Sequence, residues 1–200
     1  MTTRNTTKRS SGTGPARRQA GGPSLRETLR RIRLFATDVD GVLTDAGMYY
    51  SESGDEWKKF NTRDGMGIKL LQRAGLITAI VTQERTRLVA RRAEKLAIPE
   101  LHQGVMDKLS VIREMAARHG LSLDQVAYIG DDVNDIEALK AVGLSASPAD
   151  GLPQVLKIVG YVCQKKGGEG AVRELAEMIL KAQGQVPSFK VQVSSSRKRS

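Results

Sequence analysis

The sequence predicts a doubly wound α/β fold, with a mostly parallel, Rossmann-like sheet and a projecting β-hairpin. Two observations indicate this fold. From residue 34 onward, short apolar runs alternate with stretches of helical period, which is typical of a parallel sheet covered on both faces. Residues 42–60 break the alternation, because two β-like arms surround the turn-rich string SESGDE.

Each expected element follows from a local pattern. Apolar runs predict strands at about residues 34–40, 77–82, 100–103, 125–130, 143–146 and 161–164. Stretches of helical period predict helices at about residues 64–74, 85–97, 107–119, 132–141, 151–158 and 169–182. Gly75, Gly120 and Gly143 follow three of these helices, where a left-handed residue is favoured.

The positive charge of the chain is concentrated at its two ends. The net charge is +10, but residues 1–33 hold nine basic side chains against one acidic, and residues 181–200 hold five basic and none acidic. The segment between them is slightly acidic and lacks the basic stripe of a nucleic-acid-binding domain, so no nucleic acid is expected as a partner. The polar composition predicts disordered basic tails at 1–24 and 184–200, around one domain at 25–183.

The sequence also bears on the compartment. It has no run of about 18 apolar residues and no secretory segment, which argues against membrane insertion and export. Its single cysteine, Cys163, cannot form an internal disulfide. Both observations favour the cytoplasm.

Carboxylates gather at two expected strand ends. Asp38 and Asp40 are two residues apart on an extended chain, so both side chains can face one pocket. Asp131, Asp132 and Asp135 follow another strand, and the carboxyl ends of parallel strands meet at one edge of a sheet. Since this much negative charge is costly without a cation, the pattern predicts a Mg²⁺ site.

Two further residues suit an oxyanion. Thr82 ends a strand directly before a helix, where a hydroxyl and free backbone N–H groups can hold a phosphate. Lys108 lies in the first turn of an expected helix, where the helix dipole disfavours a cation. A nearby anion would explain that lysine.

In order and spacing, these residues resemble the four motifs of the haloacid dehalogenase superfamily. The string DVDGVLTD at 38–45 resembles the first motif, Thr82 the second, Lys108 the third and GDDVND at 130–135 the fourth. The resemblance implies a Mg²⁺-dependent phosphomonoester hydrolase that forms an aspartyl phosphate. The match spans most of the α/β alternation, which makes it far more specific than any single motif.

The resemblance also implies a role for each matched residue. Asp38 would be the nucleophile, and Asp40 would protonate the leaving group and then activate water. Mg²⁺ would be held by Asp38, the Asp40 carbonyl and Asp131. The remaining roles are phosphate binding by Thr82 and Lys108, and orientation of Lys108 and of the metal's water by Asp132 and Asp135.

A narrower resemblance follows from what the chain lacks. Only about forty residues separate Asp40 from Thr82, which leaves no room for a separate cap domain beside a hairpin and a helix. Capless members are the 3-deoxy-D-manno-octulosonate 8-phosphate phosphatases and their 2-keto-3-deoxynononate 9-phosphate relatives. The strings FNTRDGMGI (60–68) and KKGGEGAVREL (165–175) are similar to theirs. This implies a homotetramer that acts on a sugar acid phosphate, with each site completed by a neighbouring subunit.

Substrate-binding residues are implied in three places. The first is the entrance, with Asn61, Arg63 and Asp64, and the second is a flexible segment reaching a neighbour, with Lys166, Gly167 and Gly168. The third is the second motif, which reads Thr82-Gln83-Glu84 where octulosonate phosphatases usually read T-G-R. Glu84 with Lys95 is similar to the nonulosonate enzymes instead. Eleven residues of helix span about 16 Å, so either one substrate meets these two side chains from different subunits or Lys95 is a surface residue.

Two alternatives remain open from the sequence. An open site without its own cap could serve a broad-specificity sugar phosphatase. The domain could also be a non-catalytic binding or regulatory module whose basic tails hold nucleic acid, although a scaffold would have no reason to retain the complete set of motif residues.

Overall fold

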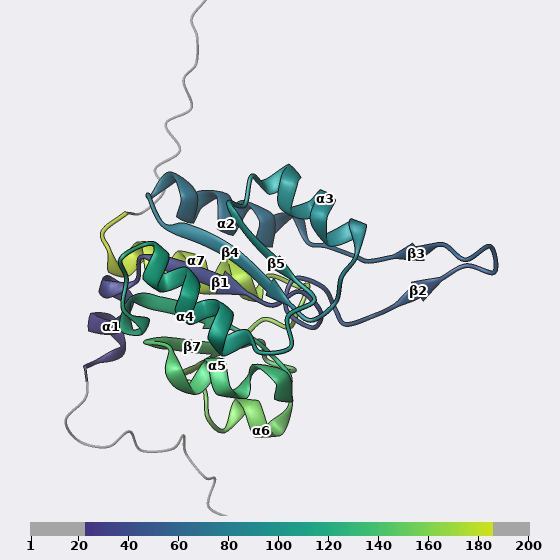
Figure 1. Cartoon of the computed structure of the whole chain (residues 1–200). Helices are drawn as coiled ribbons and strands as arrows, with labels where there is room; N and C mark the ends of the chain where they lie inside the picture. Colours follow the sequence, from purple (N-terminus) through teal and green to yellow (C-terminus); the bar gives the residue numbers. More distant parts are fainter. Residues whose placement is uncertain (1–22, 186–200) are drawn as a thin grey trace, which may run out of the picture.

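The computed structural model describes residues 23–185 and contains a six-stranded sheet between two layers of helices (Figure 1). The strand order is β5-β4-β1-β6-β7-β8, and all neighbours are parallel. The strands are β1 (Leu34–Thr37), β4 (Ile77–Thr82), β5 (Glu100–Gln103), β6 (Val126–Ile129), β7 (Leu144–Ser147) and β8 (Tyr161–Val162). This confirms the predicted α/β sheet. The predicted tails lie almost wholly outside the described residues.

Helices cover both faces of the sheet. One layer contains α1 (Leu25–Arg31), α2 (Thr62–Arg73), α3 (Arg87–Leu96) and α7 (Ala171–Ala182); the other contains α4 (Lys108–Arg118), α5 (Ile136–Ala141) and α6 (Pro153–Leu156). Neighbouring side chains of β1 point to opposite faces of the sheet. Phe35 packs in the core beneath α1, α2, α3 and α7, and Leu34 packs in the core beneath α4, α5 and α6. Burial on both faces explains why this strand reads as a continuous apolar run.

Helix α1 was not predicted. Its start is fixed by a capping box, in which the Ser24 hydroxyl accepts from the Glu27 N–H and the Glu27 carboxylate accepts from the Ser24 N–H. Arg30 Nε then donates to the carbonyl of Ala182 at the end of α7. The Ser-x-x-Glu spacing at 24–27 is the sequence signal for this helix.

One predicted helix begins later than expected. The segment 132–141 opens with a 3-10 turn, Val133–Asp135, and α5 starts only at Ile136. The cause is Asp135, whose carboxylate turns back to accept from the N–H groups of Asp131 and Asp132. The turn places this buried carboxylate beneath the carboxyl end of β6.

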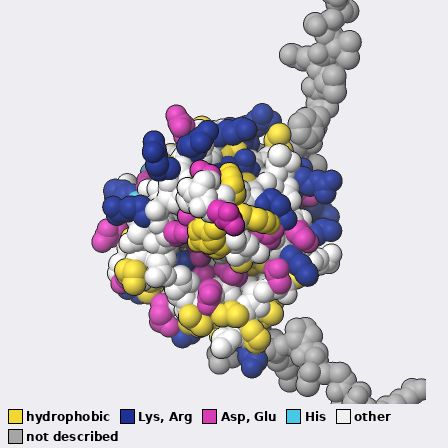
Figure 2. Space-filling view, turned by 90° about the vertical axis from the view of Figure 1, so that its right-hand side faces the viewer, with side chains coloured by type: hydrophobic (Ala, Val, Ile, Leu, Met, Phe, Trp, Pro, Cys, Tyr) yellow, Lys and Arg dark blue, Asp and Glu magenta, His cyan; other side chains and the backbone are white. Residues whose placement is uncertain are grey.

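The predicted hairpin is present and projects from the body (Figure 1). Its strands are β2 (Tyr49–Tyr50) and β3 (Glu56–Trp57). Viewed from this side, hydrophobic side chains lie at the centre of the molecular face, with acidic side chains beside them (Figure 2). Tyr50 is 67% exposed and Trp57 is 52% exposed.

The two ends of the described chain meet where the strands of the sheet begin, at the end of the molecule away from the hairpin (Figure 1). Residues from α1, the end of α2 and the end of α7 surround one basic cavity there, which Arg26, Arg30, Arg33 and Lys181 line. The hairpin lies at the other end of the molecule (Figure 1). Between residues 23 and 185, no helix has the length and apolarity needed to cross a membrane.

Candidate active site

A cavity of about 460 Å³ opens at the carboxyl ends of β1, β4 and β6. Parallel sheets of this kind place their sites at this edge. The lining side chains come from the loops after these three strands and are mostly polar or acidic: Asp38, Asp40, Ala46, Thr82, Gln83, Glu84, Asp131, Asp132 and Asn134. The residues expected from the first, second and fourth motifs are thus brought together.

Lys108 reaches this site from the first position of α4. It is only 2% exposed, and its Nζ donates to Asp38 Oδ2 and to Asp135 Oδ1, each at 2.6 Å. Burial lowers the pKa of Lys108, but the two carboxylates raise it above its ordinary value, so the side chain is an ammonium. These carboxylates are the anions that offset its unfavourable place in the helix dipole.

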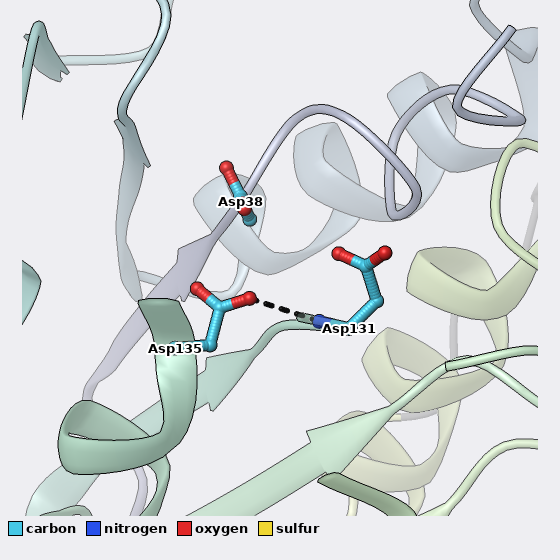
Figure 3. A group of neighbouring side chains, drawn as sticks. All are labelled: Asp38, Asp131 and Asp135. Atoms are coloured by element: carbon cyan, nitrogen blue, oxygen red, sulfur yellow. Dashed lines mark hydrogen bonds between the residues drawn. The ribbon is translucent and has the colours of Figure 1, made fainter. Parts of the chain in front are cut away.

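Asp135 has no free acceptor capacity. Its Oδ1 accepts from Lys108 and from the Tyr128 hydroxyl, and its Oδ2 accepts from the backbone N–H groups of Asp131 and Asp132. The bond to Asp131 is drawn in Figure 3. Four donors for one fully buried carboxylate make Asp135 an organiser of the site rather than a metal ligand.

The Asp131 carboxylate has far fewer hydrogen-bond donors than that of Asp135. Its Oδ1 is buried and has no hydrogen-bond partner among the described residues. The carboxylate lies against Gly41, where a Cβ would come within 1.9 Å of Asp131 Oδ2, so this position requires glycine. Burial, and then the nearby Asp38 carboxylate, raise the pKa of Asp131 to about 8. A cation bound beside Asp131 would lower this pKa.

Oxygen atoms of Asp38, Asp131 and Asp135 lie within 4.8 Å of one another (Figure 3). Burial, followed by the charge of Asp135, raises the pKa of Asp38 to about 6, although Lys108 opposes this. Since Asp135 is fully hydrogen-bonded, the oxygens able to hold a metal ion come from Asp38 and Asp131. This donor set suits a hard divalent cation that keeps several waters.

Asp40 and Glu84 share a lysine that sequence reasoning missed. Lys58 donates its Nζ to Asp40 Oδ1 at 2.6 Å and to Glu84 Oε2. Burial lowers the pKa of Lys58, but the two carboxylates raise it above its ordinary value. Lys58, Asp40 and Glu84 are far apart in the sequence, so no local spacing could have revealed the contact. They meet because each one follows a strand, β3, β1 and β4 respectively.

The rest of the second motif lies where it was expected. Thr82 ends β4 with 1% of its surface exposed, at the inner wall of the cavity. Gln83 accepts a hydrogen bond from Asn134 across the mouth, at 3.0 Å. Glu84 lines the same mouth.

The expected substrate contact by Asp64 is wrong for this chain. Its side chain is fully buried, and its oxygens accept from the N–H groups of Gly170 and Arg173. Gly170 has no side chain to cap α7, so Asp64 supplies the cap from α2. Asn61 also has a structural task, because it caps α2 and donates to the Gly168 carbonyl.

The segment expected to reach a neighbour is partly tied to its own chain. Gly168 donates its N–H to the Val42 carbonyl, and Gly167 donates to Asp150. A Cβ on Gly167 would lie 2.0 Å from the Gly41 carbonyl oxygen, so close packing explains this glycine better than flexibility does. Lys166, directly before these two glycines, is exposed.

Arg63 and Lys95 do not line the cavity between Asp38 and Glu84. Arg63 lines a second cavity beside α7, and Lys95 lines a third together with Lys58 and Arg91. Within one chain, Lys95 and Glu84 therefore belong to different cavities. The predicted substrate contacts of Arg63, Lys95 and Lys166 stay predictions.

Comparison with known proteins identifies the family. A family model for haloacid dehalogenase-like hydrolases matches residues 94–175. The chain is 44% identical, over 81% of its length and 88% of the relative's, to a 3-deoxy-D-manno-octulosonate 8-phosphate phosphatase from Yersinia pestis. It is 39% identical, over 80% of its length and 86% of the relative's, to the Escherichia coli K12 protein of that name.

Comparison with solved structures identifies the same family. An octulosonate 8-phosphate phosphatase from Moraxella catarrhalis, in complex with magnesium, phosphate and a KDO molecule, matches with a TM-score of 0.78 and 40% identity, over 80% of this chain and 91% of that one. A cobalt-bound octulosonate 8-phosphate phosphatase from Haemophilus influenzae matches with a TM-score of 0.78 and 37% identity, over 82% and 95%.

The chain therefore belongs to the haloacid dehalogenase-like hydrolases. Within them it is a phosphatase of the capless octulosonate phosphatase group, and its hairpin lies between β1 and α2. The non-catalytic alternative is not supported by these relatives.

Proposed function

We propose that this protein hydrolyses 3-deoxy-D-manno-octulosonate 8-phosphate with the help of Mg²⁺. The observation that carries the proposal is the convergence of Asp38, Lys108 and Asp131 in one cavity, in a chain whose relatives are named for this substrate. A binding module would not need a buried ammonium held between two carboxylates.

In the proposed mechanism, an Asp38 oxygen attacks phosphorus and forms an aspartyl phosphate. Asp40 donates a proton to the leaving oxygen, and it later takes a proton from the water that hydrolyses the intermediate. Lys108 and Thr82 hold the phosphate oxygens at the inner wall of the cavity. Asp135 keeps Lys108 in place through its 2.6 Å hydrogen bond, and Asp132 lines the mouth.

The residues present fit a magnesium ion. Asp131 Oδ1 has no partner among the described residues, and each Asp38 oxygen accepts one hydrogen bond, which leaves acceptor capacity for a metal ion. The Asp40 carbonyl is the third protein ligand in this proposal. Mg²⁺ would neutralise charge on the transferring phosphoryl group. The magnesium and cobalt complexes of the two relatives support this assignment.

We also propose a homotetramer of phosphatase domains spanning residues 25–183. A sugar acid phosphate carries a carboxylate besides its phosphate, and a carboxylate is best bound by a cation. Lys108 and Lys58 bind carboxylates that line the cavity, and each is already paired with two acids. A cation from a second copy, such as Arg63, Lys95 or Lys166, would complete the site.

The test is phosphate release from octulosonate 8-phosphate and nonulosonate 9-phosphate, side by side with simple sugar phosphates. We expect octulosonate 8-phosphate to be preferred by about a hundredfold in kcat/KM, which is about 2.7 kcal/mol of transition-state stabilisation. A preference for the nine-carbon acid would favour the second candidate, which Glu84 suggests. Equal rates across the panel would establish a broad sugar phosphatase instead.

A further inference from the structure

Lys58 lies at the base of the hairpin, directly after β3, and its side chain runs back toward the active site. Its Nζ donates to Asp40 Oδ1 and to Glu84 Oε2. The Lys58 side chain has no exposed surface, whereas those of Asp40 and Glu84 are 34% and 35% exposed. The ammonium is therefore covered, while both of its acceptors face the cavity.

Such burial is costly and needs a reason. An ammonium loses its hydration when it is covered, and only close anionic partners offset that loss. A lysine that merely keeps the hairpin soluble would face water, as the neighbouring Lys59 does with 57% of its side chain exposed. Lys58 instead joins three segments: the hairpin base, the loop after β1 and the loop after β4.

The contact decides how the Asp40 carboxylate is oriented. Among the described residues, Lys58 is the only hydrogen-bond donor to this carboxylate, and it uses Oδ1. Because Lys58 engages Oδ1, Oδ2 is the oxygen that remains for proton transfer in this proposal. A general acid must hold its proton within hydrogen-bond reach of the leaving oxygen, so a freely rotating carboxylate would serve poorly.

We propose that Lys58 is a positioning residue for proton transfer by Asp40, and that Glu84 anchors Lys58. As the Asp38 oxygen forms its bond to phosphorus, the bond from phosphorus to the leaving oxygen breaks, and the proton passes from Asp40 Oδ2 to that oxygen. The inference rests on the role proposed above for Asp40. It gives Glu84 a task that requires no contact with the substrate.

The experiment compares two leaving groups in the full chain with Mg²⁺. A nitrophenolate leaves without a proton, whereas the alkoxide of octulosonate 8-phosphate, or of the best sugar phosphate in the panel, must be protonated. The quantity is kcat/KM, because it reports the steps up to formation of the aspartyl phosphate, which is the same for both substrates. For Lys58→Met, we expect a loss on the alkyl phosphate about 10- to 100-fold greater than on p-nitrophenyl phosphate.

Three further variants sharpen the test. Glu84→Gln is expected to give the same selective loss with a smaller size, and Lys58→Arg to recover part of the alkyl phosphate activity. The adjacent Lys59→Met is the matched control, with both activities kept. Equal losses on the two substrates for Lys58→Met would overturn the inference alone. A wild-type protein that hydrolyses neither substrate would overturn the proposed function as well.

Discussion

Two lysines balance four carboxylates of the site. Lys108 lies between Asp38 and Asp135, and Lys58 lies between Asp40 and Glu84. In contrast, Asp131 Oδ1 is buried without a partner in the described chain, and the pKa of this carboxyl is raised to about 8. A divalent cation that binds Asp131 in the folded state would therefore stabilise the protein.

The first prediction concerns Asp131 and pH. Without divalent cations, the folded protein keeps a proton on Asp131 that the unfolded chain has lost, between the ordinary pKa of aspartate and about 8. Because the folded state then binds more protons, stability falls as pH rises through this window. We expect the Tm of the metal-free protein to fall from about pH 5 to about pH 8, and to fall less in Asp131→Asn.

Mg²⁺ supplies the complementary measurement. A cation that binds only the folded state at about a hundred times its Kd stabilises it by about 2.7 kcal/mol. Thermal melts at pH 8 should therefore show Mg²⁺ raising the Tm of the wild type and leaving Asp131→Asn nearly unchanged. Equal stabilisation of both proteins would place the metal elsewhere.

The second prediction concerns the nucleophile. Asp38→Asn keeps the shape of the side chain but cannot form the aspartyl phosphate, so kcat on p-nitrophenyl phosphate should fall by a factor on the order of 10⁴ or more. Steady-state assays with Mg²⁺ measure this, and the surface variant Asp124→Asn provides the control. Turnover that survives the change would remove Asp38 from the mechanism.

At this scale, the sequence was sufficient for residues that belong to contiguous motifs. The spacing of Asp38 and Asp40, and the GDDVND run, placed carboxylates at strand ends where the structure has them. Asp64 was misread, since no local pattern distinguishes an entrance carboxylate from one that caps a distant helix. Lys58 was missed for the same reason, because its partners meet it only in the folded chain.

Among the elements, α2 and α7 are joined at the Asp64 carboxylate. This side chain accepts the N–H groups of Gly170 and Arg173, and Gly67 of α2 packs so closely on α7 that a Cβ would lie 2.9 Å from the Arg173 Cα. The same junction holds the 165–170 loop, whose Gly168 bonds to the loop after β1. The N-terminal cap of α7 and the loop after β1 are therefore linked through the 165–170 loop.

The third prediction tests that junction. Asp64→Ala leaves two backbone N–H groups without their acceptor and should lower the free energy of unfolding by about 1–3 kcal/mol. Asp64→Asn keeps an acceptor oxygen and should cost less. Urea denaturation compares the two variants with the wild type. An unchanged midpoint for Asp64→Ala would mean that the cap contributes nothing.

Element prediction succeeded where burial dominates. The central strands could be located from their apolar runs because both faces of the sheet are covered. The helix expected at 151–158 shrinks to four residues, Pro153–Leu156, since Val155 is its only buried side chain. The sequence signal for helix α1 is its capping box, which is easily overlooked in a segment rich in arginine.

For the whole molecule, the exposed hairpin is the feature that calls for a partner. A two-stranded hairpin is marginally stable alone, and Tyr49, Tyr50 and Trp57 leave large apolar side chains in water. A second copy of this chain is the partner proposed above. The assembly could not be read from composition, since apolar side chains on a hairpin do not by themselves specify a partner.

The fourth prediction follows from this exposure. We expect light scattering to give the mass of a tetramer for the wild type and a smaller species for Tyr50→Asp, because a carboxylate would be desolvated in the interface. Tyr50→Phe keeps the apolar surface and should remain a tetramer. A monomeric wild type that still prefers the sugar acid phosphate would refute the assembly, and the site would then have to be complete in one chain.

The ends of the described chain and the catalytic mouth occupy opposite poles, since α1 and the end of α7 meet at the edge where the strands begin. A fluorescent reporter or an affinity handle joined at either end would therefore stand well away from the mouth. Captured on a sensor chip through such a handle, the enzyme would keep its cavity turned toward the flowing solution.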